Sequence, residues 1–173
     1  HYLPPYQASS LFRTAELMTL DPGEVTGGAS RPLQEAVARQ RSVKSEMEIA
    51  EIDDALHVTH KMYRRAMARI RPGIYEHEVA GAMQGVALEH NRQQAFNPIV
   101  TIHGEILHNH SLDNLLEDGR LLLIDAGVES RRFYASDVTR TYPVNGRFNA
   151  AQKEIYEIVL KVQMESIERI RPS

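Results

Sequence analysis

The sequence predicts an α+β fold in which amphipathic helices accompany an antiparallel sheet. Apolar residues recur at helical spacing in three segments, residues 45–70, 75–90 and 149–170. Residues 121–141 instead have the pattern of two strands joined by a short turn, because a bare apolar run comes first and aromatic and β-branched residues follow it. We therefore place this hairpin at the centre of the fold.

The composition is that of an ordinary globular protein, with 173 residues of which 42% are hydrophobic and 25% charged. This length suits one domain with a core or a fragment of a larger one. A net charge of −3 argues against a nucleic-acid partner and favours small molecules or peptides. Because no apolar run is long enough for a membrane span and no signal-peptide pattern opens the chain, we expect a cytoplasmic protein without a membrane partner. The absence of cysteine leaves only oxygen and nitrogen ligands for a metal.

Residues 1 to about 40 lack sustained periodicity. Turn signals interrupt them at residues 21–23 and 27–28, and residues 33–41 have room for one or two helical turns. We interpret residues 1–40 as the end of an N-terminal domain and a linker. An N-terminal arm of the domain that follows explains the same pattern.

The expected helices carry local start and stop signals. Ser45 and Glu48 form a capping box at the start of the first helix, and Arg-Pro-Gly at residues 71–73 ends it. Asn149 and Gln152 form a second capping box before the last helix. These signals place the helix ends independently of the apolar periodicity.

The first and last helices both end in the tetrapeptide Arg-Ile-Arg-Pro, at residues 69–72 and 169–172. The offset of 100 residues is consistent with an internal structural repeat. A chance match of a short tetrapeptide explains it equally well. If the repeat is real, we expect the chain to stop as a second repeat begins.

Strands are predicted between the second and the last helix. Residues 99–102 and 106–108 have the pattern of short strands, and the hairpin follows them. If Asp125 faces Asp137 across the hairpin, residues 130–132 form a three-residue loop, which is a common length. In that register both carboxylates project from one face, with Cβ atoms roughly 5 Å apart.

Two opposed carboxylates repel each other unless they share a proton or hold a cation. Asp125 and Asp137 are therefore candidate metal ligands. The alternatives are that one aspartate is solvated, or that Arg132 or Arg140 pairs with them. Two carboxylates are also too few for a tight site, since divalent ions take roughly four to six ligands. The remaining ligands must come from other residues.

Three histidines, His103, His108 and His110, lie just upstream of the hairpin. His108 is the strongest candidate, because it follows the apolar pair Ile106-Leu107 at the end of an expected strand. It could be a metal ligand or a hydrogen-bond donor to a reaction centre. For each histidine, an exposed loop side chain or a satisfied core residue is the alternative.

Several separate motifs resemble the Xaa-Pro aminopeptidases and prolidases of the pita-bread metallopeptidase superfamily. They occur in the family's order: RSVKSEMEIAEIDDA at residues 41–55, ILHN at 106–109, DGRLLLIDAG at 118–127 and YASDVTRTYPVNGRF at 134–148. The resemblance covers about residues 38–173. It implies a pita-bread fold, of which residues 41–173 are the first half of the catalytic domain, with the second half absent.

The resemblance also implies a metallo-exopeptidase that hydrolyses the peptide bond before proline with two divalent metal ions. Manganese is the first choice, with cobalt, zinc or iron as alternatives. Asp125 would chelate one metal, Asp137 would bridge both, and His108 would be the catalytic, substrate-side histidine that stabilises the tetrahedral intermediate. One histidine and two glutamates, the other ligands, would lie after the end of this sequence, so we expect the chain alone to be inactive.

The same resemblance implies a peptide or dipeptide substrate with proline in second position, and a homodimer or homotetramer. Two other functions on this fold are a non-catalytic binding protein and a creatinase-like hydrolase without metal. The presence of both Asp125 and Asp137 argues against these, because neither needs two opposed carboxylates. The chain departs from the family at Asn109, where an aromatic residue often follows the histidine.

Overall fold

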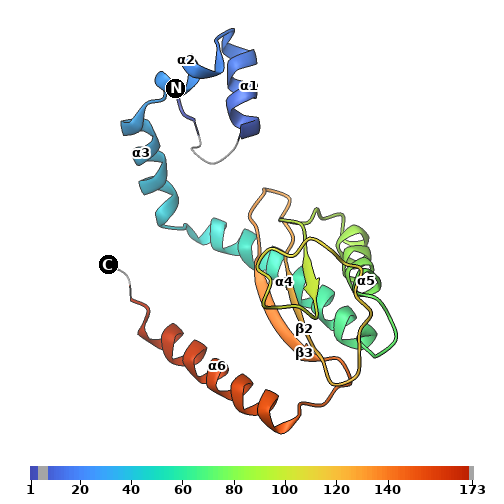
Figure 1. The fold of residues 1–173 in the computed structure, drawn as a ribbon. Coiled ribbons are helices and arrows are strands. Elements are labelled where there is room, and N and C mark those ends of the chain that lie inside the picture. Colours follow the sequence, from blue (N-terminus) through green and yellow to red (C-terminus); the bar gives the residue numbers. More distant parts are fainter. Residues whose placement is uncertain (4–7, 172–173) are drawn as a thin grey trace. The chain divides into compact units, whose positions relative to one another are not determined.

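The computed structural model describes residues 1–3 and 8–171 (Figure 1). The chain divides into two compact units, residues 1–49 and 50–173. None of the helices in the described ranges is long and apolar enough to cross a membrane. The assignment of residues 41–173 to half of a catalytic domain stays a prediction.

The first unit is helical, with α1 (Ala8–Met18), α2 (Pro22–Gly27) and α3 (Arg31–Ser42). A small core of Leu3, Ala15 and Val25 is buried there. Residues 33–41, for which one or two helical turns were expected, belong to the longer 12-residue helix α3. The residues read as a turn at positions 21–23 begin α2 instead, because aspartate is a good N-cap and proline fits the first helical position.

The second unit contains the sheet and confirms the predicted α+β class. Its strands are β1 (Ile99–Thr101), β2 (Leu121–Ala126) and β3 (Val138–Pro143), in the spatial order β1-β2-β3. Both pairs are antiparallel. The expected strand at residues 106–108 is wrong: these residues form a turn in which His108 has a φ of 54°. A left-handed residue interrupts the extended backbone that a strand needs.

The hairpin register differs from the expected one by two residues. Asp125 lies opposite Thr139, and Glu129 bridges Ala135. The loop keeps three residues, 131–133, but starts one residue later because Ser130 is the last paired residue. The buried Ser130 hydroxyl accepts hydrogen bonds from the amides of residues 132 and 134 at 3.2 and 3.3 Å. Since side chains alternate with period two, a two-residue slip keeps both aspartates on one face.

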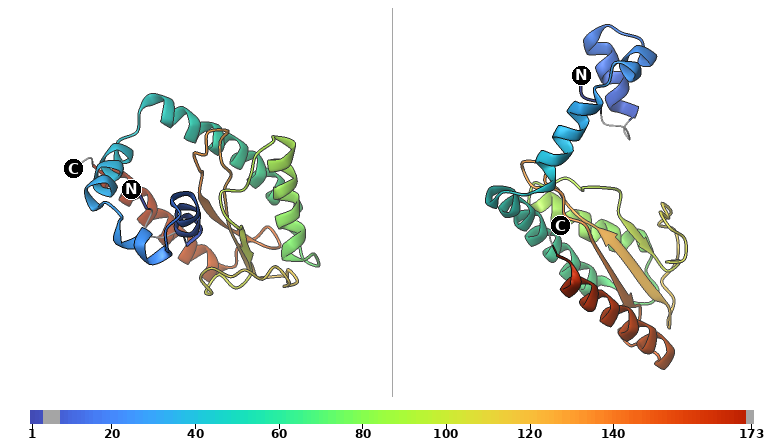
Figure 2. Two further views of the ribbon diagram at one scale, coloured as in Figure 1. Left: turned by 90° about the horizontal axis from the view of Figure 1, so that it is seen from above. Right: turned by 90° about the vertical axis from the view of Figure 1, so that its left-hand side faces the viewer.

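The core of this unit lies between the sheet and two helices, α4 (Glu46–Arg69) and α5 (Glu76–Glu89), which run alongside the strands in both views of Figure 2. Both helices were predicted, with bounds within about one residue. The largest fully buried apolar side chains are Met62, Met83, Leu116, Leu122 and Ile124. Along β2 the side chains of Leu122, Ile124 and Ala126 are buried. Asp125 therefore projects from the opposite face of the sheet.

The predicted capping boxes are present. The Ser45 amide donates to Glu48 Oε2 at 2.7 Å, and the Asn149 amide donates to Gln152 Oε1 at 3.0 Å. The second box begins α6 (Ala150–Arg169). α4 ends at Arg69 and α6 at Arg169, as the shared tetrapeptide predicts. Whether the two helices belong to a structural repeat stays a prediction.

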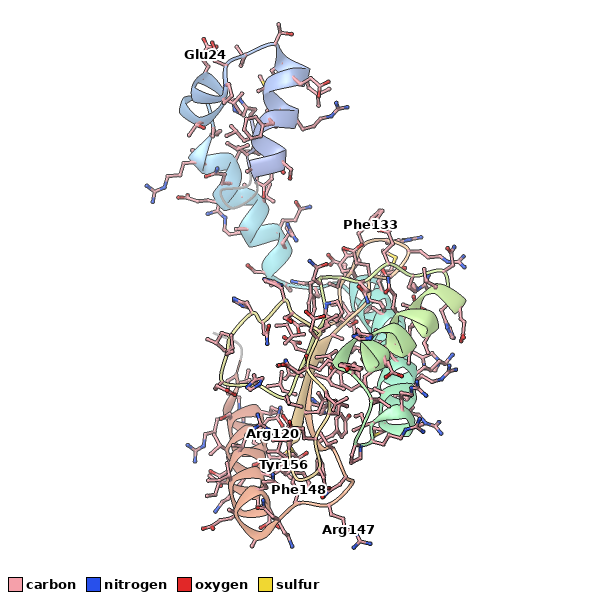
Figure 3. The ribbon with its side chains drawn as sticks, turned by 45° about the vertical axis from the view of Figure 1, so that its right-hand side comes forward. Glu24, Arg120, Phe133, Arg147, Phe148 and Tyr156 are labelled. Carbon is pink, nitrogen blue, oxygen red and sulfur yellow. The ribbon has the colours of Figure 1, made fainter. Side chains whose placement is uncertain are left out.

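α6 buries none of its residues. Its start is tied to the rest of the second unit by Gln152 Nε2, which donates to the Gly119 carbonyl at 2.8 Å. The rings of Phe148 and Tyr156 also meet there, with centroids 4.9 Å apart (Figure 3). The rest of the helix presents exposed apolar side chains, including Ile155, Ile158 and Val162.

Candidate metal and active site

The two candidate aspartates lie on one face of the β2–β3 hairpin. Asp125 is the fifth residue of β2, between Ile99 on β1 and Thr139 on β3. Asp137 immediately precedes β3 and is the diagonal neighbour of Asp125, two residues before Thr139. Diagonal neighbours lie about 7–8 Å apart. The Asp125 and Asp137 carboxyls are nevertheless close enough to form a side-chain hydrogen bond. The hairpin thus brings the two carboxylates together without placing them directly opposite.

The surroundings of Asp125 disfavour its charged form. Burial raises the pKa of the Asp125 carboxyl above its ordinary value, and the Asp137 carboxylate raises it further. A hydrogen bond with Thr139 and the charge of a protonated His108 act in the opposite direction. Asp125 Oδ1 is buried and has no hydrogen-bond partner among the described residues. A buried acceptor without a partner costs about 1–3 kcal/mol, so this oxygen fits a site where a cation is bound.

Gly127 allows the two strands to approach closely beside these aspartates. A Cβ atom at position 127 would lie 1.8 Å from the Ser136 carbonyl oxygen and 3.2 Å from the Asp137 nitrogen. Both are backbone atoms, which cannot rotate away. The glycine two residues after Asp125 is therefore required for the backbone path that presents Asp137.

Helix α4 holds the backbone on both sides of Asp137. The Thr59 and Ser136 hydroxyls are hydrogen-bonded at 2.7 Å, in a buried position. The Tyr63 hydroxyl donates to the Ile124 carbonyl at 3.1 Å and also contacts the Val138 carbonyl. Burial, and after it the Asp125 charge, raises the pKa of Tyr63, so the phenol stays a proton donor. The apolar periodicity of residues 45–70 gives no sign of this role, because it marks Tyr63 only as a residue of the buried helix face.

The Tyr63→Phe substitution is expected to lower the free energy of unfolding by about 1–2 kcal/mol, because it leaves buried carbonyls without their donor. Urea unfolding followed by circular dichroism measures this change. Tyr142→Phe is the matched control, since its ring also packs against this core from β3. Equal stability of the two variants would contradict a structural role for the Tyr63 hydroxyl.

The three candidate histidines have different surroundings. His103 lies 3.0 Å from Glu105 and is paired with it. His108 and His110 are exposed, and only His108 is among the groups that influence the pKa of Asp125. Within residues 1–3 and 8–171, no three histidine, aspartate or glutamate side chains converge closely enough to hold a metal ion. The structure thus assembles two carboxylates with one histidine in electrostatic range.

Comparison with known proteins identifies the family of this site. The profile of metallopeptidase family M24 matches residues 50–173, which contain both aspartates and His108. This chain belongs to metallopeptidase family M24. The predicted resemblance to Xaa-Pro aminopeptidases is confirmed by a relative of that name from Escherichia coli (strain K12), 41% identical over 139 residues.

Solved structures of aminopeptidase P are also similar to this chain. Aminopeptidase P of Escherichia coli in complex with substrate matches 99% of this chain with a TM-score of 0.79 and 34% identity. The zinc-substituted form of that enzyme in complex with product has a TM-score of 0.77 and 35% identity. The chain described here spans 31% of the length of the Escherichia coli relative and 40% of the length of these two solved chains.

Proposed function

We propose that this chain carries part of the active site of a proline-specific exopeptidase, an Xaa-Pro aminopeptidase or dipeptidase that hydrolyses the peptide bond before proline. The observation that carries the proposal is the buried Asp125 Oδ1 beside Asp137, which has no hydrogen-bond partner in the described part of the chain, in a member of a metallopeptidase family. The names of the relatives, Xaa-Pro aminopeptidase and aminopeptidase P, support the choice of substrate.

Asp125 and Asp137 would hold divalent metal ions, for which we propose two manganese ions, with cobalt, zinc or iron as alternatives. When bound, such ions supply a water of lowered pKa and polarise the scissile carbonyl. Carboxylate oxygens are hard donors that suit these ions. Two aspartates do not complete a coordination shell of roughly four to six donors, so we propose that other residues of the protein provide the rest.

His108 would act on the substrate. Its imidazole lies in the loop between β1 and β2, in electrostatic range of Asp125. From there it would donate a hydrogen bond to the oxygen of the scissile carbonyl, where negative charge develops during hydrolysis. Its exposure leaves the ring free to meet a peptide, which a buried histidine could not do.

His108→Ala in the full-length, manganese-loaded protein is expected to lower kcat for an X-Pro peptide by about a hundredfold to a thousandfold, because a donor to the developing oxyanion is lost. Bound manganese, measured on the same sample by elemental analysis, is expected to stay the same. His103→Ala is the control, since that histidine shares the loop but pairs with Glu105. A large loss of manganese in the His108 variant would make His108 a metal ligand instead.

The function itself is tested by incubating the full-length, manganese-loaded protein with X-Pro dipeptides, longer X-Pro peptides and their X-Ala counterparts. Cleavage of X-Pro bonds that stops when a chelator removes the metal supports the proposal. Cleavage that survives metal removal would favour a creatinase-like hydrolase. Binding without any cleavage would favour a non-catalytic role. The preference between dipeptides and longer peptides follows from the same assay, whereas a homo-oligomer and a cytoplasmic location stay predictions.

A further inference from the structure

Glu76 is a carboxylate with no exposed surface, at the first position of α5. Burying a charge is costly unless donors surround it. Glu76 Oε1 accepts from the Ile102 amide at 2.8 Å, and Oε2 accepts from the Asn114 amide at 3.2 Å. Asn114 Nδ2 donates to both oxygens, at 3.1 and 3.0 Å. No lysine or arginine of the described ranges forms an ion pair with it, so neutral donors alone satisfy this carboxylate.

These donors lie at the two ends of one loop. Residues 102–114 lead from β1 toward β2 and carry His108 in their middle. The same loop caps α5: the backbone amides of Glu76 and His77 donate to the carbonyls of Asn114 and Leu112, both at 3.1 Å. Amides of a first helical turn have no partner inside the helix, so the loop satisfies them. Both ends of the loop are thereby tied to the start of α5.

The middle of the loop is held against the face of the sheet that carries Asp125. Asn109, directly after His108, donates from Nδ2 to the Thr101 hydroxyl at 3.1 Å. Thr101 is buried and lies opposite Leu123, two residues before Asp125 on β2. Gly104 also packs on the Leu123 side chain: a Cβ atom added at Gly104 would lie 3.3 Å from Leu123 Cδ1. The loop thus packs on Leu123, two residues before Asp125 and on the same face of β2.

We propose that Glu76 is a positioning residue that holds the 102–114 loop closed and so keeps His108 at the Asp125 site. An unanchored loop of this length samples many conformations, and ordering it costs conformational entropy. His108 also has a left-handed backbone, which needs support from its surroundings. Closing the loop through one buried carboxylate supplies that support. The consequence for catalysis rests on the function proposed above, whereas the consequence for loop order does not.

Glu76→Gln tests the inference in the full-length, manganese-loaded protein. Glutamine keeps the size of the side chain but turns one acceptor oxygen into an NH₂ group that faces donors. Amide hydrogen exchange in residues 102–114 is expected to rise about tenfold or more, with exchange in β2 and α4 unchanged. For an X-Pro peptide, kcat is expected to fall about tenfold to a hundredfold with little change in KM or bound manganese, since a misplacement of about 1 Å costs that much.

Glu78→Gln is the matched control, because this half-buried glutamate of the same helix accepts from the Tyr75 amide and pairs with Arg69 outside the loop. It is expected to change neither loop exchange nor kcat. Asn114→Ala removes two of the four hydrogen bonds to Glu76 and serves as the milder variant if Glu76→Gln reduces the folded fraction.

Three outcomes decide the inference. Faster exchange confined to the loop supports it, even in a protein that cleaves no X-Pro bond, and in that case only the proposed function fails. Unchanged hydrogen exchange of residues 102–114 in both Glu76→Gln and Asn114→Ala would overturn it. Faster exchange spread evenly over the sheet and α4 would also overturn it, because Glu76 would then serve general stability and not the position of His108.

Discussion

The Asp125→Asn variant of the full-length protein is expected to lose manganese binding by at least about a hundredfold and to lose X-Pro cleavage with it. Asparagine keeps the shape of the side chain but removes the negative charge beside Asp137. Replacing a residue that only hydrogen-bonds to a metal ligand lowers metal affinity about tenfold to a hundredfold. Replacing a ligand itself is expected to lower the affinity more. Manganese titration, followed by the electron spin resonance of the free ion, measures the affinity.

The same variant is expected to fold at least as well as the parent without metal. Burial and the neighbouring carboxylate raise the pKa of Asp125 in the folded chain. The protonated Asp125 carboxyl therefore stabilises the fold fully at pH values below the pKa that it has in the unfolded chain. This stabilisation is lost as the pH rises through the higher pKa of the folded chain. Asparagine does not ionise, so this stabilisation is not lost at higher pH. The metal-free Asp125→Asn variant is expected to have a higher Tm than the metal-free parent at neutral pH, and the difference in Tm is expected to shrink under acidic conditions.

Asp53→Asn provides the control for both measurements, since that aspartate is exposed on α4. It is expected to leave manganese affinity and Tm unchanged. A variant at position 125 that bound manganese as tightly as the parent would remove Asp125 from the metal site. The proposed function would then lose the observation that carries it.

Gly127→Ala is expected to destabilise the protein by about 3 kcal/mol or more. The new methyl group would lie 1.8 Å from the Ser136 carbonyl oxygen, so the backbone of one strand has to move. Inserting a methylene into packed structure typically costs about 1–3 kcal/mol and occasionally more, and the upper end is expected here because the clashing atoms belong to the backbone. Because Asp137 follows Ser136, the displacement is expected to abolish manganese binding even in the fraction that folds. Urea unfolding gives the first quantity and metal titration the second.

Gly81→Ala and Gly85→Ala are the matched controls. Both glycines lie in α5, and an added Cβ would meet no atom within 4 Å at either position. Alanine in a helix interior is favoured over glycine by about 0.5–1 kcal/mol, so these variants are expected to be more stable than the parent. A Gly127 variant that was as stable as either control would show that the strands can separate without cost.

The sequence by itself determined the helices of the second unit and the identity of the hairpin. Ser45 with Glu48, and Asn149 with Gln152, mark helix starts because capping is a contact between residues three positions apart. The apolar run of residues 121–124 marks a buried strand for a similarly local reason. The choice of Asp125 and Asp137 as candidate ligands needed only their place on two adjacent strands, and their role as ligands stays a prediction.

Only the tertiary structure decided the register of the hairpin and the support of the site. The register depends on Ser130, which closes the loop, and on the close approach at Gly127, and neither contact follows from periodicity. Tyr63 and Glu76 act across 61 and 38 residues of chain, on Ile124 and Asn114. Such contacts depend on where helices settle against the sheet. Asp125 and Asp137 still share one face of the hairpin, as predicted, because a register shift of two residues returns every side chain to the same face of the sheet.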